Sequence, residues 1–272
     1  MTGENEPHVS IASRDSGRLG VTPVRTPIFG LGGDLIAFVT ESLGGPLAAR
    51  AALNGRILAV TSKLLSLAEN GIVPKASISK ADLIRREADQ VLGESEFRGE
   101  SGQRVLLTLK QGLYMAAAGI DESNVASPRD SNVESSAGAY LTLPKDLDRS
   151  TRALHAGLKQ SLQLQSFGLI VTDSRTTPLR RGVTGVALSS AGFYPTRSLI
   201  GRPDLFGRAL KMTSINVVDA LAVAAVYAMG EADEQTPLAI LDGHGAEFST
   251  VSAPDDPADV RIAPKDDLFR LR

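Results

Sequence analysis

Two hydrophobic patterns run along this chain, one with the period of a helix and one with the short apolar runs of buried strands. Helical spacing is found in residues 34–43, 80–94, 147–163 and 214–230. Short apolar runs predict strands over residues 56–63, 104–109, 113–119, 167–173 and 237–242, and the second and third of these predict a hairpin. Residues 185–193 predict a small-residue strand or a close-packed turn.

These elements lack the regular strand–helix alternation of a doubly wound sheet, so the pattern indicates a mixed α/β or α+β fold. Both ends of the chain are polar. We expect a mobile tail over residues 1–17 and a loosely held tail over residues 251–272. Residues 18–250 are expected to form one folded unit, as a single domain or as two intimate subdomains.

Composition excludes several classes of protein. The formal net charge of −2 argues against a nucleic-acid partner bound through a general basic field. The absence of cysteine excludes disulfides, thiolate nucleophiles and Cys-based zinc sites. Aromatic residues make up only 4% of the chain, so the core must consist mainly of Ala, Val, Leu and Ile. The polar N-terminus and the shortness of the apolar runs predict a cytoplasmic protein with no membrane partner.

Carboxylates stand at the ends of three apolar segments. Asp121 follows one predicted strand and Asp173, with Ser174 beside it, follows another, while Glu231 follows the helix at 214–230. Hard oxygen ligands of this kind suit Mg²⁺ or Mn²⁺. Each acid alone is more simply explained as a turn former, a helix cap or part of a solvated loop, and composition does not show that the three converge.

Two adjacent arginines, Arg180 and Arg181, follow the second of these acids. Their planar guanidinium groups could orient a phosphate or the carboxylates of a substrate. A solvated surface pair is the simpler interpretation. The glycine-rich stretch at residues 30–35 resembles a phosphate loop, but it follows no clear strand and is more often an ordinary tight turn.

Seven motifs in order resemble the coenzyme F-420 gamma-glutamyl ligase family. They are TPIFGLGGDL, LAVTSKLLSLAENGIV, QGLYMAAAGIDESNV, LTLPKD, IVTDSRTTPLRRGVTGVALSSAGF, IGRPDLFGRALKMTSINVVDALAVAA and AMGEADEQTPLAIL, which together extend from about residue 22 to 242. DSRTTPLRRGVTG and GEADEQTPLAI look closer to the branch described as folate-metabolism gamma-glutamate ligases.

The resemblance implies an α+β homodimer that uses GTP and two divalent metal ions to form an amide bond. It assigns Asp121 and Asp173 to one metal, and Ser174 and Glu231 to the other. The residues that it assigns to the nucleotide are Thr26, Pro27, Ile28, Phe29, Ser62, Lys63, Asn124, Met229, Gly230, Glu231, Ala232, Asp233, Glu234, Gln235 and Thr236.

One position departs from the family pattern. Where the family's SKAEG stretch has a lysine expected to meet the nucleotide phosphates, this chain has Leu67. Lys63 lies four residues earlier, on the same face if the segment is helical, and could substitute. The departure leaves open whether the nucleotide is GTP or ATP.

The resemblance therefore predicts a metal- and nucleotide-dependent ligase that joins L-glutamate to a folate-type or F-420-type acceptor through an acyl phosphate. Two alternatives remain, a non-catalytic homologue that binds nucleotide and metal, and a metal-dependent phosphohydrolase. In the ligase hypothesis, Arg180 or Arg181 assists catalysis by orienting a phosphate or glutamate.

Overall fold

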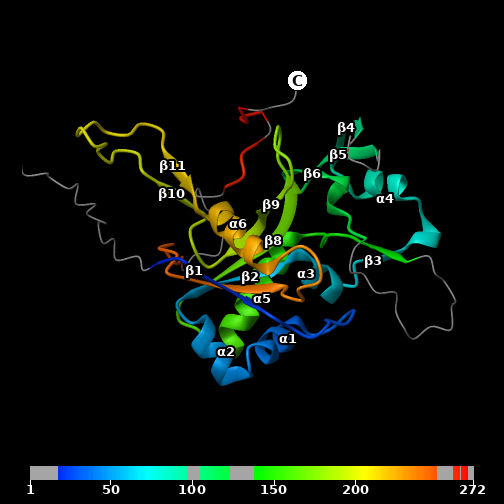
Figure 1. The fold of residues 1–272 in the computed structure, drawn as a ribbon, viewed down its shortest axis with the longest axis horizontal. Helices are drawn as coiled ribbons and strands as arrows, with labels where there is room; N and C mark the ends of the chain where they lie inside the picture. Colours follow the sequence, from blue (N-terminus) through cyan, green and yellow to red (C-terminus); the bar gives the residue numbers. More distant parts are fainter. Residues whose placement is uncertain (1–17, 97–103, 123–137, 250–259, 264, 269–272) are drawn as a thin grey trace, which may run out of the picture.

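The computed structural model describes residues 18–96, 104–122, 138–249, 260–263 and 265–268. This part of the chain has an α+β fold built on a five-stranded mixed sheet (Figure 1). The strand order of the sheet is β1 (Gly20–Val24), β12 (Leu238–Asp242), β2 (Arg56–Thr61), β8 (Phe167–Thr176) and β9 (Val183–Ala191). Only β2 and β8 pair in parallel, so their carboxyl ends lie at the same edge.

Helices cover both faces of this sheet, which explains why residues 57–60 of β2 and residues 167–171 of β8 are buried and free of charged side chains. Leu58 and Val60 of β2 join one cluster, to which α1 (Leu35–Ser42), α2 (Pro46–Leu53) and α5 (Leu147–Ser161) contribute. Ile57 and Ala59 join a second cluster under α6 (Val217–Met229). As composition predicted, both clusters consist mainly of aliphatic side chains.

Smaller elements surround the central sheet (Figure 1). A three-stranded sheet of β4 (Gln90–Glu96), β5 (Arg104–Lys110) and β6 (Leu113–Ala116) packs with α4 (Lys80–Glu87). The short strands β3 (Ile72–Pro74) and β7 (Ala139–Leu141) form one pair, and β10 (Thr196–Ser198) and β11 (Ser214–Asn216) form another at the base of a protruding hairpin. The remaining elements are α3 (Ser62–Ala68) and the 3₁₀ turns Lys75–Ser77 and Ala117–Gly119.

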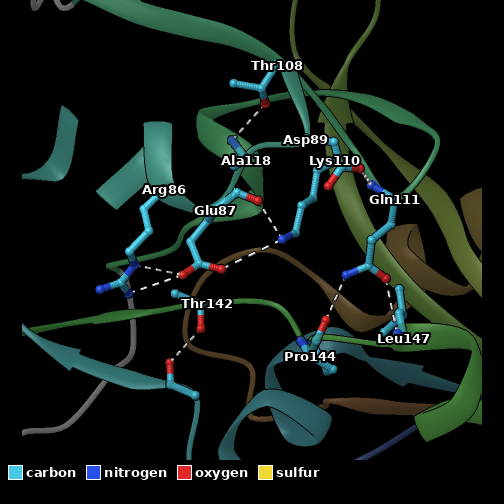
Figure 2. A network of polar contacts seen from close by, with 11 residues as sticks. Arg86, Glu87, Asp89, Thr108, Lys110, Gln111, Ala118, Thr142, Pro144 and Leu147 are labelled. Carbon is cyan, nitrogen blue, oxygen red and sulfur yellow. Dashed lines mark hydrogen bonds and ion pairs between the residues drawn. The ribbon is translucent and has the colours of Figure 1, made fainter. Parts of the chain in front are cut away.

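A polar network joins the small sheet to the start of α5 (Figure 2). Lys110 Nζ donates to the carbonyl of Glu87 at 2.5 Å. The side chain of Gln111 donates to the carbonyl of Pro144 at 2.7 Å and accepts from Leu147 N at 3.1 Å. These bonds fix the β5–β6 hairpin against the body of the protein.

The same network fixes the backbone that leads to Asp121. Ala117 and Ala118 have φ values of 53° and 52°, in the left-handed region that residues other than glycine seldom adopt. The Thr108 hydroxyl, fully buried, accepts from Ala118 N at 2.9 Å (Figure 2). It donates to Met115 O at 2.8 Å. A buried hydroxyl therefore stabilises an unusual turn three residues before a candidate ligand.

Two predicted helices were too long. The predicted helix over residues 80–94 ends at Glu87, because Ala88 is extended and residues 90–96 pair with β5 as a strand. The predicted helix over residues 214–230 begins only at Val217, where Asn216 caps it, and Ser214–Asn216 pairs with β10. The expected hairpin is confirmed, and residues 185–193 prove to be largely strand.

The predicted tails lie mostly outside the described residues. Within residues 260–263, Val260 packs against the α6 cluster, and Nη2 of Arg261 lies 2.8 Å from Oδ2 of Asp148. The division of the chain into one unit and two tails stays a prediction. None of the helices in the described ranges has the length and hydropathy that a membrane crossing requires.

Candidate active site

A pocket of about 950 Å³ opens where β2 ends beside residues 172–174 of β8. Its walls come from the loop after β1, the start of α3, the segment at Asp121, the end of β8 and the loop between α6 and β12. It brings together nearly all the predicted site residues, namely Thr26, Pro27, Ile28, Phe29, Lys63, Asp121, Asp173, Ser174 and the whole loop Met229–Thr236. Segments more than 200 residues apart in sequence thus share one cavity.

Asp173 is held from two sides. Its Oδ2 accepts from the Ser62 hydroxyl at 3.1 Å, and its Oδ1 accepts from the backbone N–H of Ser174 at 2.8 Å. Burial raises the pKa of this carboxyl to about 6, and the charge of Asp121 adds to the rise, while the two hydrogen bonds and Lys63 oppose it. The site therefore holds a carboxylate whose charge is only partly compensated by the protein.

A β-bulge lies next to Asp173. The register of β8 against β9 shifts between Val171 and Thr172, so that Leu188 of β9 is an extra residue. Bulges turn side chains away from the regular alternation of a strand and are common beside active sites. This one lies immediately before the polar end of β8.

Asp121 lies outside the central sheet, where it forms an isolated bridge with Leu141 of β7. Its Oδ2 lies 2.7 Å from Lys63 Nζ. The next residue, Glu122, pairs with Lys75 at 2.5 Å and with Lys80. Because Ser62 and Lys63 are consecutive, the first turn of α3 reaches both aspartates.

The two candidate nucleotide loops support each other. Thr26 N donates to Gln235 O at 3.0 Å, Thr61 N donates to Pro237 O at 3.0 Å, and the Thr236 hydroxyl donates to Met229 O. Glu234 accepts from Ala232 N at 2.8 Å, and backbone hydrogen bonds of this kind hold its pKa below the usual value. The Glu234 side chain thus stabilises the conformation of the loop to which it belongs.

The pocket is strongly acidic. Among the described residues that line it, Lys63 is the one cation, against the five carboxylates of Asp121, Asp173, Glu231, Asp233 and Glu234. Leu67 also lines the pocket, so the departure from the family pattern leaves an apolar side chain in the wall.

The donor set fits a hard divalent cation in part. Asp121 and Asp173 are close enough to repel each other, and the Lys63 ammonium already lies at one Asp121 oxygen. Within the described part of the chain, however, no three His, Cys, Asp or Glu side chains gather closely enough to hold a metal by themselves. Mg²⁺ commonly completes its shell with water and substrate phosphates, which suits a site with few protein ligands.

Other predicted residues lie apart from this pocket. Arg180 and Arg181 are exposed between β8 and β9 and do not line the cavity. Asn124 lies outside the described residues. Ser62 touches Asp173 and does not line the cavity. Glu231, in contrast, does line the cavity, and it is exposed. The assignment of individual residues to metal or nucleotide stays a prediction.

Sequence reasoning missed several pocket residues. Thr61 is the last residue of β2 and pairs with Thr172 of β8, and Val226 belongs to the last turns of α6. The parallel ends of two buried strands are a signal that could have identified the threonines. Val226 has no such signal, because its apolar side chain fits a core position equally well.

Comparison with known proteins identifies the family to which this chain belongs. The model of the family described as F420-0:Gamma-glutamyl ligase matches residues 23–243, and the chain belongs to this family. Among curated proteins, the coenzyme F420:L-glutamate ligase of Methanopyrus kandleri is 32% identical over 79% of this chain and 86% of its own length. The coenzyme F420:L-glutamate ligase of Methanothermobacter thermautotrophicus is 31% identical over 80% of this chain and 86% of its own length. The resemblance seen in the seven motifs is confirmed.

Proposed function

We propose that the protein is a glutamate ligase that uses a nucleoside triphosphate and divalent metal ions to join L-glutamate to a small-molecule acceptor through an amide bond. Membership of the family and the names of its curated relatives support the ligase activity. The acceptor is of the coenzyme F-420 type or the folate type, and the nucleotide is GTP or ATP.

The observation that carries the proposal is the charge of the pocket. Five carboxylates face a single ammonium group among the described lining residues, so a triphosphate would be repelled by the protein alone. Divalent cations remove this repulsion. An acidic pocket lined by residues that the family resemblance assigns to the nucleotide is therefore explained by joint binding of metal and nucleotide.

We assign Asp121 and Asp173 to one Mg²⁺ or Mn²⁺ ion, and Ser174 and Glu231 to the second. When bound, such ions would neutralise charge on the phosphoryl group during its transfer. The hydrogen bonds from Ser62 and Ser174 keep the carboxylate of Asp173 oriented in the absence of any ligand. The loops Thr26–Phe29 and Met229–Thr236 bind and position the nucleotide.

The proposed reaction has two steps. An oxygen of the acceptor carboxylate attacks the γ-phosphorus, and the bond between that phosphorus and the β–γ bridging oxygen breaks, which yields nucleoside diphosphate and an acyl phosphate. The ammonium group of glutamate gives one proton to the solvent, and the free amine attacks the acyl carbon. Phosphate leaves with the electrons of the carbon–oxygen bond and takes up the second proton from the amide nitrogen. The pocket residues contribute chiefly by holding the reactants in position. In this scheme Arg180 or Arg181 orients a phosphate or glutamate.

We further propose a homodimer. The hairpin between β10 and β11 exposes large apolar side chains, namely Ile200 (61% exposed), Leu205 (92%), Phe206 (78%) and Met212 (88%). Apolar surface of this kind on a protruding two-stranded hairpin is typical of an interface. Sedimentation velocity of the wild type and of Phe206→Ser tests it, because a monomeric wild-type protein would contradict the proposal.

The ligase activity is tested with purified protein, Mg²⁺ or Mn²⁺, GTP or ATP, L-glutamate and either a deazaflavin or a folate acceptor, with product mass as the readout. We expect an acceptor mass increased by one or more glutamates. Phosphate release that does not depend on glutamate or acceptor would instead indicate a phosphohydrolase. Nucleotide binding without any turnover would indicate a non-catalytic homologue.

A further inference from the structure

The ion pair between Lys63 and Asp121 joins a candidate metal ligand to a candidate phosphate ligand. Lys63 Nζ lies 2.7 Å from Asp121 Oδ2. Both side chains line the pocket, and both are about one-third exposed, at 31% and 32%. The ammonium group thus occupies an oxygen that the proposed function assigns to a divalent cation, and it is also the one cation among the described lining residues.

We propose that Lys63 is an exchangeable counter-ion, which neutralises Asp121 in the metal-free protein and moves to the nucleotide phosphates once a divalent cation is bound at Asp121. This inference rests on the proposed function, whose metal and nucleotide it connects. It gives Lys63 two successive partners and makes its contribution to nucleotide binding conditional on the metal.

Electrostatics favours the exchange in both directions. Without a metal, Asp121 and Asp173 repel each other, and Lys63 is attracted to both carboxylates. A divalent cation at the same carboxylates would repel the ammonium group, while the phosphates that arrive with it offer new negative charge. The most favourable position of Lys63 therefore changes when the site fills.

The local structure permits this movement. Lys63 lies in the first turn of α3, and its ammonium is carried on a flexible four-carbon stem. The ion pair is accessible to water, and pairs of this kind contribute little to stability, so breaking it needs little compensation. One turn later, Leu67 lines the same pocket without a charge, so in this chain the phosphate contact falls to Lys63.

Lys63→Met tests the exchange, because methionine keeps an unbranched apolar stem and removes the charge. Two equilibria are measured without turnover. The first is Mn²⁺ binding to the nucleotide-free protein, followed by electron paramagnetic resonance. The second is calorimetric binding of guanylyl or adenylyl imidodiphosphate, whichever the wild type binds, with and without Mn²⁺.

We expect opposite effects on the two ligands. The variant should bind Mn²⁺ alone severalfold more tightly, because a competing cation is gone. It should bind the nucleotide analogue about tenfold more weakly in the presence of Mn²⁺, as loss of a charged contact predicts. Without Mn²⁺, its affinity for the analogue should fall by a clearly smaller factor, because Lys63 is then engaged with Asp121 and its loss acts only through the more negative pocket.

The control is Lys80→Met, which removes the same charge from a lysine paired with the neighbouring Glu122, outside the pocket lining. It should alter neither equilibrium. Lys63→Arg, which retains the charge, should behave like the wild type within a few fold, and circular dichroism of all variants confirms that they fold.

Two outcomes would overturn the exchange. One is a loss of analogue affinity in Lys63→Met by the same factor with and without Mn²⁺, which would make Lys63 a permanent phosphate ligand. The other is weaker Mn²⁺ binding by the variant. In both cases the proposed function stands, because the wild type still binds metal and nucleotide. If the wild type binds neither, the proposed function fails and the exchange fails with it.

Discussion

Ser62 Oγ donates a 3.1 Å hydrogen bond to Asp173 Oδ2 across two neighbouring parallel strands. Ser62 is the first residue of α3, directly after β2, and Asp173 lies on β8 one residue beyond the paired position of Thr61. The hydroxyl is almost fully buried and therefore has little access to water. The start of the helix thus fixes the orientation of the candidate ligand.

Ser62→Ala should weaken Mn²⁺ binding several-fold and lower the free energy of unfolding by about 1–2 kcal/mol, since a hydrogen bond to a charged group is lost. Mn²⁺ titration and urea unfolding measure the two effects. Ser66→Ala is a matched control, because its buried hydroxyl donates to the helix carbonyl of Ser62 at 3.0 Å and not to Asp173. Equal Mn²⁺ affinities in both variants would contradict a positioning role for Ser62.

Asp173→Asn should abolish ligase activity and Mn²⁺ binding while leaving the metal-free protein at least as stable. Burial raises the pKa of Asp173 to about 6, so above that pH the carboxyl is ionised in the folded protein and its buried charge lowers the stability of the fold relative to the unfolded chain. A neutral amide relieves this cost, and we expect the free energy of unfolding at pH 7.5 to stay the same or rise by about 1 kcal/mol. Strong destabilisation with retained activity would show that Asp173 is a structural residue.

The convergence of the acids was beyond the reach of hydrophobic periodicity. The buried strands β2 and β8 were predicted from their apolar runs. The prediction that the strand ends at Asp173 was wrong, because β8 continues to Thr176 in its pairing with β9. The parallel pairing of β2 and β8, which brings Ser62 to Asp173, depends on contacts between segments 111 residues apart. The ordered motifs supplied the remaining site residues through the family resemblance.

Where the predicted secondary structure was wrong, contacts between distant segments outweighed the local hydrophobic pattern. Residues 90–94 continue the amphipathic spacing of α4, yet they form β4 because β5 offers a partner edge. Asp121 was predicted to follow an apolar strand, but a left-handed turn at Ala117 and Ala118 intervenes. Ala does not signal such a turn, so only the structure reveals how the chain is redirected toward the pocket.

Thr108→Val tests that redirection. Valine preserves the volume of the buried side chain but removes the hydroxyl that binds Ala118 N and Met115 O. We expect a loss of about 1–3 kcal/mol in unfolding free energy, because a buried N–H is left unsatisfied, together with weaker Mn²⁺ binding through displacement of Asp121. Thr108→Ser keeps the hydroxyl and should retain Mn²⁺ binding. Unchanged Mn²⁺ affinity in the valine variant would show that this turn does not control the position of Asp121 for metal binding.

His155 should make stability depend on pH away from the pocket. Its ring stacks on Phe167 at 5.3 Å and its Nε2 lies 3.0 Å from Phe167 O. Burial holds the pKa of His155 below its usual value, so the unfolded chain takes up the proton first as pH falls through about 6.5. The stability contributed by neutral His155 is therefore present above that pH and lost below it.

Urea unfolding of the wild type and His155→Gln at pH 7.5 and 5.5 isolates this effect, because other titrating groups, His244 among them, are common to both proteins. The stability advantage of the wild type should shrink by about 1 kcal/mol between the two pH values, within the limit of about 1.4 kcal/mol per pH unit for one proton. An advantage that stays constant would place the His155 pKa at its ordinary value.

Leu67→Lys would restore the cation that the family pattern has in the pocket wall. Leu67 is partly buried, so the change should lower the free energy of unfolding by about 1–2 kcal/mol. The loss is no larger because the apolar stem of lysine can stay packed while its ammonium group reaches the cavity. In an acidic pocket the new charge should strengthen binding of a triphosphate analogue about tenfold in calorimetry. Leu67→Met, uncharged and of similar size, should leave that affinity unchanged. If the lysine variant binds the analogue no better than the methionine variant, the phosphates do not lie near this wall, and the nucleotide must enter the pocket in another orientation.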